Sequence, residues 1–430
     1  MIDKKIVLIG AGSAQFGLET VGSILSSEVL QGSTISLLDI NQETLNMVKI
    51  ICENAINDLN LNFKLESTTN RKDALINADF IISSIETGSR FELWEQDYNI
   101  PRKFGSKQIF GENGGPGGLF HSLRQIKSML PICEDINKIC PDALLINFSN
   151  PMSRICLGIM RKFPNLKFVG LCHEIHFLKM HLPRMLNQPF SNFEINAGGL
   201  NHFGILLNIK YKDSGIDAYP DIRAKALDYF KNGREVNLIK EIIRIYDYLP
   251  YTTDSHFGEY IHWAYDVYNK TDVENFYDLY KASCIIGAKK FIKLATNKRR
   301  SKQWIRPSNE SAIPIIEGIL TNSGHKELSV NLSNKDGLIE NLPRDLVIEG
   351  PAIINKNGVN GIKLKSIPKG LAGLMRNQAS VQDLTVEAAL KKDKNIALQA
   401  LLVDPVVDSI DQAEKILDEM IKLQGKYLPF

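Results

Sequence analysis

Two residues with metal-binding side chains stand near the ends of predicted strands in this sequence. Cys172 follows the apolar run at residues 168–171, and His202 follows a strand-like run that ends in a pair of glycines. A thiolate and an imidazole can together bind one divalent cation and leave coordination positions open for substrate oxygens. The pair also fits a simpler interpretation, in which Cys172 is a buried thiol and His202 is a hydrogen-bonded core residue.

A glycine-rich turn near the N-terminus has the form of a dinucleotide-binding loop. Gly10 and Gly12 follow an apolar run and open a helical pattern, and Asp39 ends the next apolar run. Such glycines let the backbone approach a pyrophosphate at the helix N-terminus, and the acidic residue can bind the adenosine ribose. We therefore predict an NAD site rather than an NADP site. Gln15 stands where a third glycine is usual, although Gly17 follows, and a tight turn in another α/β fold is the alternative.

Composition and missing motifs exclude several functions. The sequence has no Gly-x-Ser-x-Gly turn of a serine hydrolase, and a pair of sugar-flanking carboxylates cannot be recognised from spacing. With 51 basic and 49 acidic residues, the chain has no electrostatic reason to bind nucleic acid or an anionic membrane. It has no apolar run of 18 residues and no secretory segment, so we expect a cytoplasmic protein with its six cysteines reduced.

The elements that position these residues alternate between short apolar strands and amphipathic helices. This alternation predicts an α/β fold with a doubly wound parallel sheet of Rossmann type, which gathers ligands at the carboxyl ends of its strands. We predict strands at residues 5–9, 34–38, 80–85, 143–148 and 168–171, and helices at 42–60 and 119–140.

The second half of the chain has a mixed pattern without a flexible linker. We predict an NAD-binding Rossmann domain over residues 1–190, and an α+β domain over 191–430 that serves substrate, metal and oligomerisation. The expected elements of the second half are strand at 193–209, strands and loops at 327–368, and helices at 225–248, 259–268, 273–297 and 386–424.

Several sequence blocks, taken in order, resemble glycoside hydrolase family 4 over nearly the whole chain. Any one block is unspecific, but their order and spacing together are highly specific. The resemblance implies a fold of the lactate/malate dehydrogenase superfamily. The blocks are Gly10-Ala-Gly12-Ser13-Ala-Gln-Phe16, Ile100-Pro101-x-Lys103-Phe104-Gly105, Glu112-Asn113-Gly114-Gly115-Pro116-Gly117-Gly118, Asn150-Pro151-Met152-Ser153, Cys172-His173, Gly199-Leu200-Asn201-His202-Phe203, Asn341-Leu342-Pro343, Thr385-Val386-Glu387-Ala388 and Asp404-Pro405.

The resemblance implies hydrolysis of an α-glycosidic bond by a redox–elimination route, with NAD and Mn²⁺ as cofactors. In this route NAD⁺ takes hydride from C3 of the sugar, and the resulting ketone acidifies the proton on C2. A base removes that proton, the glycosidic oxygen leaves C1, water adds, and the retained NADH reduces C3 again. NAD is therefore not consumed, and two catalytic carboxylates are not required.

The same resemblance implies roles for individual residues. Cys172 and His202 would hold the Mn²⁺ ion, which prefers harder ligands than a thiolate, so that metal retention would be weak and sensitive to oxidation. Asn150 would contact both the nicotinamide and the sugar hydroxyls. His173 would protonate the leaving oxygen, since the pKa of an imidazole lies near neutrality.

The catalytic base stays open between two residues of one segment. Asp254 is slightly favoured over Tyr251, although Asp254 also fits a cap for the helix expected at 259–268. The remaining expected contacts are those of Gly10, Gly12, Ser13, Phe16, Asp39, Glu112 and Asn150 with the cofactor, and those of Asn150, Glu174 and Asn201 with the substrate.

The residues after Cys172 bear on the identity of the sugar. The run through His173, Glu174 and Ile175 is similar to family members that cleave α-galacturonides, whereas α-galactosidases more often have serine at position 174. Members acting on 6-phosphorylated sugars tend to have Asn or Asp after the cysteine, and often an arginine where this chain has Trp94. The resemblance therefore favours an α-galacturonide, then an α-galactoside, then an α-glucuronide. A uronide carboxylate beside Glu174 would need either a cation between the two or a basic group that Glu174 orients, and the candidates for that cation are Arg90, Arg154 and Lys179.

Two other classes of protein share part of this pattern. A lactate- or malate-dehydrogenase-like enzyme would have the same fold and glycine loop, but it would not need Cys172 with His202 and would accumulate NADH. A non-catalytic NAD-binding module would not need that pair either. The expected partner is a small oligosaccharide or glycoside, without nucleic acid or membrane, and the expected assembly is a homodimer or homotetramer.

Overall fold

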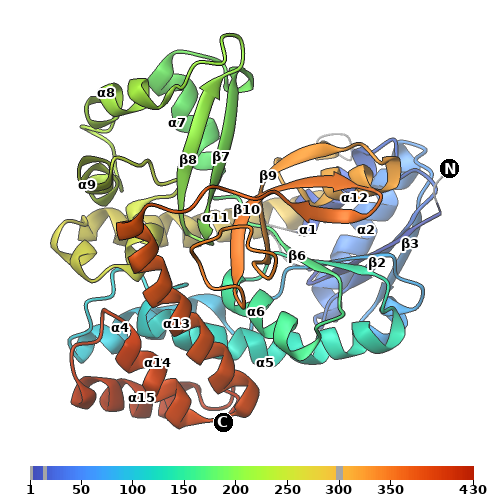
Figure 1. The fold of residues 1–430 in the computed structure, drawn as a ribbon. Coiled ribbons are helices and arrows are strands. Elements are labelled where there is room, and N and C mark those ends of the chain that lie inside the picture. Colours follow the sequence, from blue (N-terminus) through green and yellow to red (C-terminus); the bar gives the residue numbers. More distant parts are fainter. Residues whose placement is uncertain (1–2, 13–16, 297–303) are drawn as a thin grey trace.

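One mixed sheet runs through the molecule in the order β3-β2-β1-β4-β5-β6-β9-β10-β7-β8, with β11 paired to β10. The computed structural model describes residues 3–12, 17–296 and 304–430 (Figure 1). Within these residues the strands are β1 (Lys5–Ile9), β2 (Thr34–Leu38), β3 (Lys64–Thr68), β4 (Phe80–Ser83), β5 (Leu144–Asn147), β6 (Phe168–Gly170), β7 (Phe193–Leu200), β8 (Phe203–Tyr211), β9 (His325–Ser333), β10 (Val347–Asn355) and β11 (Gly358–Gly361).

The first six strands form the predicted Rossmann-type sheet. All of their pairings are parallel, and the order 3-2-1-4-5-6 is the one typical of dinucleotide-binding folds. The five strands predicted in this half are present, and the fold class is confirmed. Strand β3 was not predicted, because it lies at the sheet edge, is only partly covered, and reads Lys-Leu-Glu-Ser-Thr without an apolar run.

The second half of the chain extends this sheet. Strand β9 pairs antiparallel with β6 through Gly170 and Asn331, and β10 pairs with β9 and with β7. Strands β7 and β8 form a long hairpin whose turn holds Asn201 and His202. Strand β10 joins this hairpin through the pairing of Glu349 with Gly199. This pairing brings Glu349, which is more than 140 positions from His202 in the chain, into the neighbourhood of His202.

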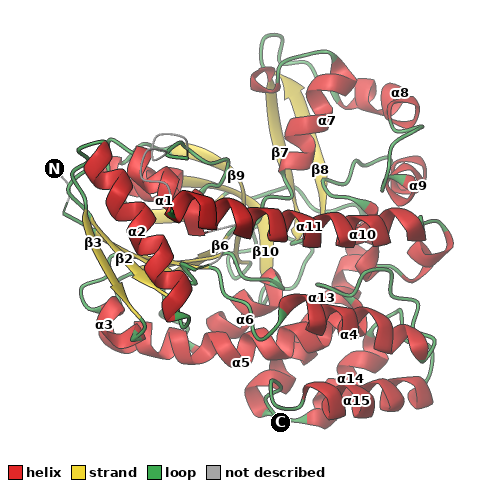
Figure 2. Cartoon of the chain, turned by 180° about the vertical axis from the view of Figure 1, so that it is seen from behind, coloured by secondary structure: helices red, strands yellow, loops and turns green. Residues whose placement is uncertain are grey.

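Helices cover both faces of the sheet. Side chains at alternate positions of β1 pack into two different clusters, Val7 and Ile9 into one and Ile6 and Leu8 into the other. Helices α1, α2, α11 and α12 lie over one face, whereas α3, α5 and α6 lie over the other (Figure 2). Their bounds are α1 (Gly17–Ser26), α2 (Gln42–Asp58), α3 (Arg71–Leu75), α5 (Gly115–Ile139), α6 (Met152–Lys162), α11 (Lys270–Ala295) and α12 (Ala312–Thr321).

Three predicted helices of the second half are interrupted. The helix expected at 225–248 is two helices, α8 (Tyr219–Tyr229) and α9 (Asn237–Tyr246), separated by a turn at Gly233. The helix expected at 259–268 is a pair of 3₁₀ turns, η2 (Gly258–Tyr260) and η3 (His262–Asp266). The helix expected at 386–424 belongs to α13 (Lys369–Lys391), α14 (Lys394–Val403) and α15 (Ile410–Gln424).

The breaks in the last of these regions have local causes. Lys392 adopts a left-handed φ of 58° after α13, and Pro405 follows the end of α14. These helices pack with α4 (Arg90–Lys103) and α5 at the lower end of the view in Figure 1. None of the helices in the described parts of the chain is long and apolar enough to cross a membrane.

Candidate active site

The glycine loop after β1 has the close backbone contacts that a dinucleotide fold requires. Gly10 has φ +86°, and a Cβ there would lie 2.2 Å from the Ser84 carbonyl oxygen. The Gly12 N–H donates to Oδ2 of Asp39 over 2.8 Å, which places Asp39 beside the loop. A Cβ on Gly17 would lie 2.2 Å from the Ala11 carbonyl oxygen. Gly17 therefore provides the close helix–strand approach that a third glycine usually allows.

The loop thus has the shape that the cofactor prediction requires. Gly10, Gly12 and Asp39 come together at the carboxyl ends of β1 and β2, where α1 begins. This arrangement fits an adenine dinucleotide at the helix N-terminus. The two other predicted loop contacts, Ser13 and Phe16, lie outside the described residues.

The structure brings Cys172 and His202 together. The Cys172 sulfur lies 3.1 Å from Nε2 of His202, although 30 residues separate them in the chain. Cys172 follows β6 by two residues, and His202 occupies the β7–β8 turn with a left-handed φ of 61°. A carboxylate from Glu174 is close enough that one donor atom of each residue lies within 4.8 Å of the others. A sulfur, a nitrogen and an oxygen donor at this spacing fit a divalent cation.

Burial controls the protonation of this cluster. Burial, together with the charges of Glu174 and Glu349, raises the pKa of the Cys172 thiol well above its usual range. Burial and the neighbouring His256 lower the pKa of His202 to about 4, so that its imidazole is neutral near pH 7. A neutral imidazole can act as a ligand, and a bound cation would favour the thiolate form of the cysteine.

Glu174 is ionised despite its burial. Burial alone would raise its pKa, but His256, His202 and His173 and a hydrogen bond from the Thr252 hydroxyl lower it to about 2. The His256 imidazole contacts the His202 ring edge-on, with the ring centroids 4.6 Å apart. Sequence reasoning gave His256 no role, although it lies in the same segment as the two candidate bases.

Tyr251 lies in this cluster together with Glu349, a residue that the sequence analysis did not predict. The Tyr251 hydroxyl donates to Oε2 of Glu349 over 3.1 Å, and Ser329 donates to the other carboxylate oxygen over 2.6 Å. The Asn201 side-chain amide also donates to Glu349, over 3.4 Å. Burial raises the pKa of Glu349 to about 7. A lone glutamate inside the apolar strand Val347–Asn355 was the available signal.

Asp254, the slightly favoured base, is engaged elsewhere. Its two carboxylate oxygens accept the backbone N–H groups of Leu238 and Ile239, at 3.0 and 3.1 Å. Asp254 therefore caps the N-terminus of the preceding helix α9 and not the segment after it. Burial raises its pKa to about 6 even though these N–H groups oppose that shift.

His173 and Asn150 lie at the same edge of the sheet. The His173 side chain is 66% exposed, and its Nδ1 lies 3.9 Å from the Glu310 carboxylate. Asn150 follows β5, and its buried side-chain oxygen has no hydrogen-bond partner among the described residues. An orphaned acceptor at this position is suited to a hydroxyl or amide donor of a bound molecule.

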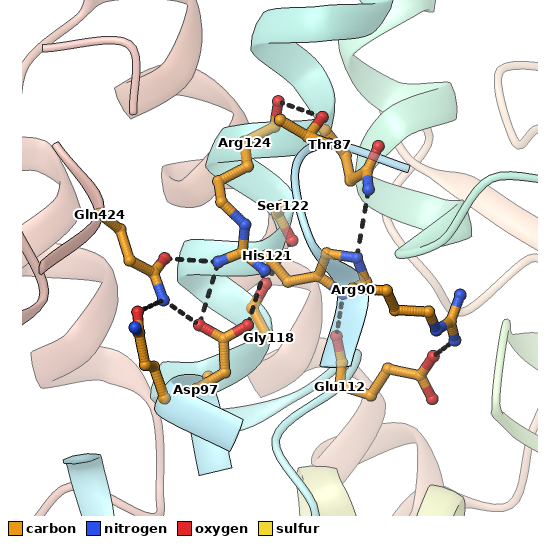
Figure 3. Close-up of polar contacts among 12 residues, drawn as sticks. Thr87, Arg90, Asp97, Glu112, Gly118, His121, Ser122, Arg124 and Gln424 are labelled. Carbon is orange, nitrogen blue, oxygen red and sulfur yellow. Dashed lines mark hydrogen bonds and ion pairs between the residues drawn. The ribbon is translucent and has the colours of Figure 1, made fainter. Parts of the chain in front are cut away.

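Glu112 belongs to a series of linked charged side chains beside the site (Figure 3). Its carboxylate accepts a 2.6 Å bond from Arg90, and its backbone oxygen is 2.8 Å from Nδ1 of His121. The Arg90 guanidinium also contacts Glu86 at 3.3 Å and lies over the Tyr280 ring. The second oxygen of Glu112 lies 4.0 Å from Nε2 of His256, so this series of charged side chains reaches the cluster around His202.

Comparison with known families agrees with this geometry. Residues 5–188 match the family model described as family 4 glycosyl hydrolase, and residues 197–407 match its C-terminal domain. The chain is 43% identical to an α-glucosidase from Erwinia rhapontici, with 99% of both proteins covered. It is 30% identical to an α-galactosidase from Bacillus subtilis (strain 168), again with 99% of both covered.

Solved structures show the same fold. A 6-phospho-α-glucosidase from gut microorganisms, crystallised with NAD and Mn²⁺, superimposes with a TM-score of 0.84 at 20% identity, covering 100% of this chain and 99% of that one. Malate dehydrogenase from Plasmodium falciparum superimposes with a TM-score of 0.53 at 16% identity, covering 90% and 99%. The family models match most of the chain, and it therefore belongs to family 4 of the glycoside hydrolases.

Proposed function

We propose that this protein hydrolyses a neutral α-glucoside, with NAD and a divalent cation such as Mn²⁺ as resident cofactors. The observation that carries the proposal is the 3.1 Å approach of Cys172 to His202 at the carboxyl edge of a Rossmann-type sheet. A dehydrogenase of similar fold has no need for this pair of ligands. When bound, NAD and the cation supply hydride exchange at C3 and Lewis acidity toward the sugar oxygens.

The protein's own residues bind the sugar and move protons. Cys172 and His202 hold the cation, and the orphaned oxygen of Asn150 accepts a hydrogen bond from the sugar or the nicotinamide amide. His173, whose side chain is 66% exposed, carries the proton to the leaving glycosidic oxygen. Its exposure lets it exchange that proton with solvent after each turnover.

Tyr251 is the better candidate for the base that removes the C2 proton. Asp254 uses both carboxylate oxygens to cap α9, so neither is available to a substrate without loss of that cap. The Tyr251 hydroxyl instead donates to the Glu349 carboxylate, whose pKa burial raises to about 7. Burial and Glu349 also raise the pKa of the Tyr251 phenol well above its usual range, and a cation held by Cys172 and His202 would oppose that shift. In this arrangement Tyr251 takes the C2 proton while Glu349 positions and receives the proton of Tyr251.

The charges in the cluster support a neutral glycone over the uronide expected from the sequence. Glu174 is ionised, and Glu112 and Glu349 are buried nearby, so a substrate carboxylate would meet like charge. Of the cations considered, Arg90 is already paired with Glu86 and Glu112. The 43% identity to an α-glucosidase supports glucose as the sugar.

Of the other two cations, Lys179 is exposed to solvent, and Arg154 is 1% exposed and donates to Ser122, with its Nε and Nη2 unpaired among the described residues. Preference for the galacturonide in the test below would therefore point to Arg154. Trp94 is buried, with its ring packed edge-on against Phe110 and Tyr277, which supports the prediction that the sugar is not phosphorylated. The expected homodimer or homotetramer stays a prediction, which sedimentation analysis of the purified protein would test.

The test compares five nitrophenyl glycosides with the purified full-length protein. The α-glucoside, its 6-phosphate, the α-galactoside, the α-galacturonide and the α-glucuronide are each offered with NAD⁺, Mn²⁺ and dithiothreitol. We expect release of nitrophenol from the α-glucoside only when all three additives are present, with no net NADH. In D₂O, the released glucose should carry deuterium at C2.

Each other outcome has a defined meaning. Release without NAD⁺, or without deuterium at C2, would overturn the redox–elimination mechanism. Faster release from the galacturonide would restore the uronide prediction. Accumulation of NADH from a small hydroxy acid, with all five glycosides intact, would make the protein a dehydrogenase of this fold.

A further inference from the structure

Glu174 shares one small space with the two residues that hold the cation in the proposed function. One carboxylate oxygen of Glu174, the Cys172 sulfur and a ring nitrogen of His202 all lie within 4.8 Å of one another. Within the described residues, no second group of three such side chains meets this condition. We propose that Glu174 is a third protein ligand of the divalent cation, an inference that rests on the proposed function.

The local backbone fixes Glu174 in this position. A turn after β6 is closed by hydrogen bonds from His176 N to His173 O and from Phe177 N to Glu174 O, both 2.9 Å. The Ile175 side chain next to Glu174 is buried, which anchors the turn to the core. Glu174 lies within this turn and Cys172 stands just before it, so both side chains come from one short segment.

The hydrogen bond to Glu174 leaves one oxygen for the cation. The Thr252 hydroxyl donates to Oε2 of Glu174, and no hydrogen bond to Oε1 is present in the described structure. Metal-binding carboxylates are usually oriented in this way by a second group that holds the other oxygen. Thr252 is fully buried, so its hydroxyl is held in place.

The donor chemistry explains how a thiolate site can hold Mn²⁺. A cysteine and a histidine alone are soft and borderline ligands, whereas Mn²⁺ prefers carboxylate and water oxygens. Adding Glu174 supplies a hard oxygen, and the thiolate and carboxylate together balance the two positive charges of the ion. Three protein donors leave three positions of an octahedral ion for sugar oxygens and water.

An ion pair with His256 is the competing role for Glu174. The ring nitrogens of His256 are directed to other groups, since Nδ1 lies 3.0 Å from the Ser255 hydroxyl and Nε2 lies 4.0 Å from Glu112. No hydrogen bond joins Glu174 to His256 within the part of the chain that the structure describes. The geometry therefore favours the cation as the partner of the free carboxylate oxygen.

The test measures Mn²⁺ binding directly in the full-length protein saturated with NAD⁺, from the electron paramagnetic resonance signal of free Mn²⁺. We expect Glu174→Gln to weaken Mn²⁺ binding by about tenfold to a hundredfold or more. Binding of Cd²⁺, which tolerates sulfur better, should weaken less. Glu310→Gln is the matched control, because it is the same substitution at a glutamate whose carboxylate lies 3.9 Å from Nδ1 of His173 but outside the three-residue group.

The outcomes separate this inference from the proposed function. Equal Mn²⁺ affinity in Glu174→Gln and the unmodified protein, or an equal loss in Glu174→Gln and Glu310→Gln, would overturn the inference and leave the proposed function intact. Selective loss in Glu174→Gln without hydrolysis of any glucoside by the unmodified protein would support the inference and overturn the function. Glu174→Asp, checked for folding by NAD⁺ binding, should bind Mn²⁺ with intermediate affinity, and an affinity below that of Glu174→Gln would also contradict the ligand role.

Discussion

The Tyr251 hydroxyl and the Glu349 carboxylate form a buried hydrogen bond of 3.1 Å between residues 98 positions apart. Tyr251 reaches this position because its ring lies over Gly204 at the start of β8, where a Cβ would come within 2.0 Å of the phenolic oxygen. Glu349 reaches it because β10 pairs with β7 at Gly199. The fold therefore places the Tyr251–Glu349 pair beside Cys172 and His202, and these four residues come from four separate parts of the chain.

Replacing Tyr251 with phenylalanine should remove the base and retain the fold. We expect kcat to fall by about 10²-fold to 10⁴-fold, because general-base catalysis contributes that much when the acceptor is well positioned. Glu349→Gln should reduce kcat by a similar factor, because the amide keeps the hydrogen bond to Tyr251 but cannot accept its proton. Steady-state hydrolysis of nitrophenyl α-glucoside would measure both.

The control for this prediction is Tyr248→Phe, a change in the same segment that leaves the Tyr251–Glu349 pair untouched. Its kcat should match that of the unmodified protein. The Tyr251→Phe protein should also stop exchanging the C2 proton with D₂O. Retained exchange at an unchanged rate would show that another group, such as Asp254, is the base.

Gly17, which takes the role of the usual third glycine of the loop, should be required for folding and NAD⁺ binding. In Gly17→Ala, the new Cβ would lie 2.2 Å from the Ala11 carbonyl oxygen, so α1 must move away from the loop. We expect a lower melting temperature and at least tenfold weaker NAD⁺ binding, measured by calorimetry. Gly373→Ala is the matched control, because no atom lies within 4 Å of a Cβ there and the residue is inside α13. It should stabilise the protein by about 0.5–1 kcal/mol.

Sequence patterns predicted the parts of the fold that local chemistry determines. Continuous apolar runs identified β1 and β2 to the residue, and the glycines identified the loop between β1 and α1. Spacing alone left two interpretations of Cys172 and His202, and the resemblance to family 4 favoured the metal site. The structure brings the two side chains together, and their role as ligands stays a prediction. Edge strand β3 and the interrupted helices were missed or misjudged, because their boundaries depend on tertiary packing and single turn residues.

The rest of the site depends on contacts between distant segments. His256 carries no local signal of its role, and the lone glutamate in β10 does not show which residues it meets. Strand β10 and the segment at 251–257 come together because each pairs with the β7–β8 hairpin. The same limit applies to Asp254, whose position after Thr253 is typical of a helix start. Only the fold shows that its carboxylate caps the preceding helix α9.

A buried ion pair between Asp97 and Arg124 should be essential for stability. The Arg124 guanidinium donates to both Asp97 oxygens at 3.0 and 2.7 Å, and Gln424 contacts both partners, joining α4, α5 and α15 (Figure 3). Both side chains are at most 2% exposed. Asp97→Asn leaves an unpaired buried guanidinium charge, and we expect a loss of about 3–5 kcal/mol in the free energy of unfolding.

Urea denaturation would measure the loss in Asp97→Asn, with Lys138→Gln as the control. Lys138 forms an exposed ion pair with Glu134 within α5, and removing such a pair should leave the free energy of unfolding nearly unchanged, because water and salt screen it. Similar losses in the two variants would contradict the importance of the buried pair.

Glu259 should make the stability of the protein decrease with rising pH. Its Oε2 accepts two 2.6 Å bonds from the Asn113 and Gly114 N–H groups at the start of α5, whereas its other oxygen is buried without a described partner. Burial raises its pKa from 4.5 to about 8. Between these two values the folded protein retains a proton that the unfolded chain has lost, so the free energy of unfolding falls as pH rises.

Glu259→Gln isolates this contribution, because the amide keeps an acceptor oxygen for the α5 N–H groups and does not ionise. We expect the stability of the unmodified protein, relative to the variant, to be greatest near pH 5 and to fall toward pH 8 by an amount on the order of a few kcal/mol. Urea denaturation of both proteins at pH 5, 6, 7 and 8 would measure the difference. Titratable groups distant from Glu259 are common to both proteins and cancel in that difference, whereas His256 and Glu112 interact with Glu259 and form part of its contribution. Parallel pH profiles would therefore show that Glu259 is ionised in the folded protein and that a partner compensates its burial.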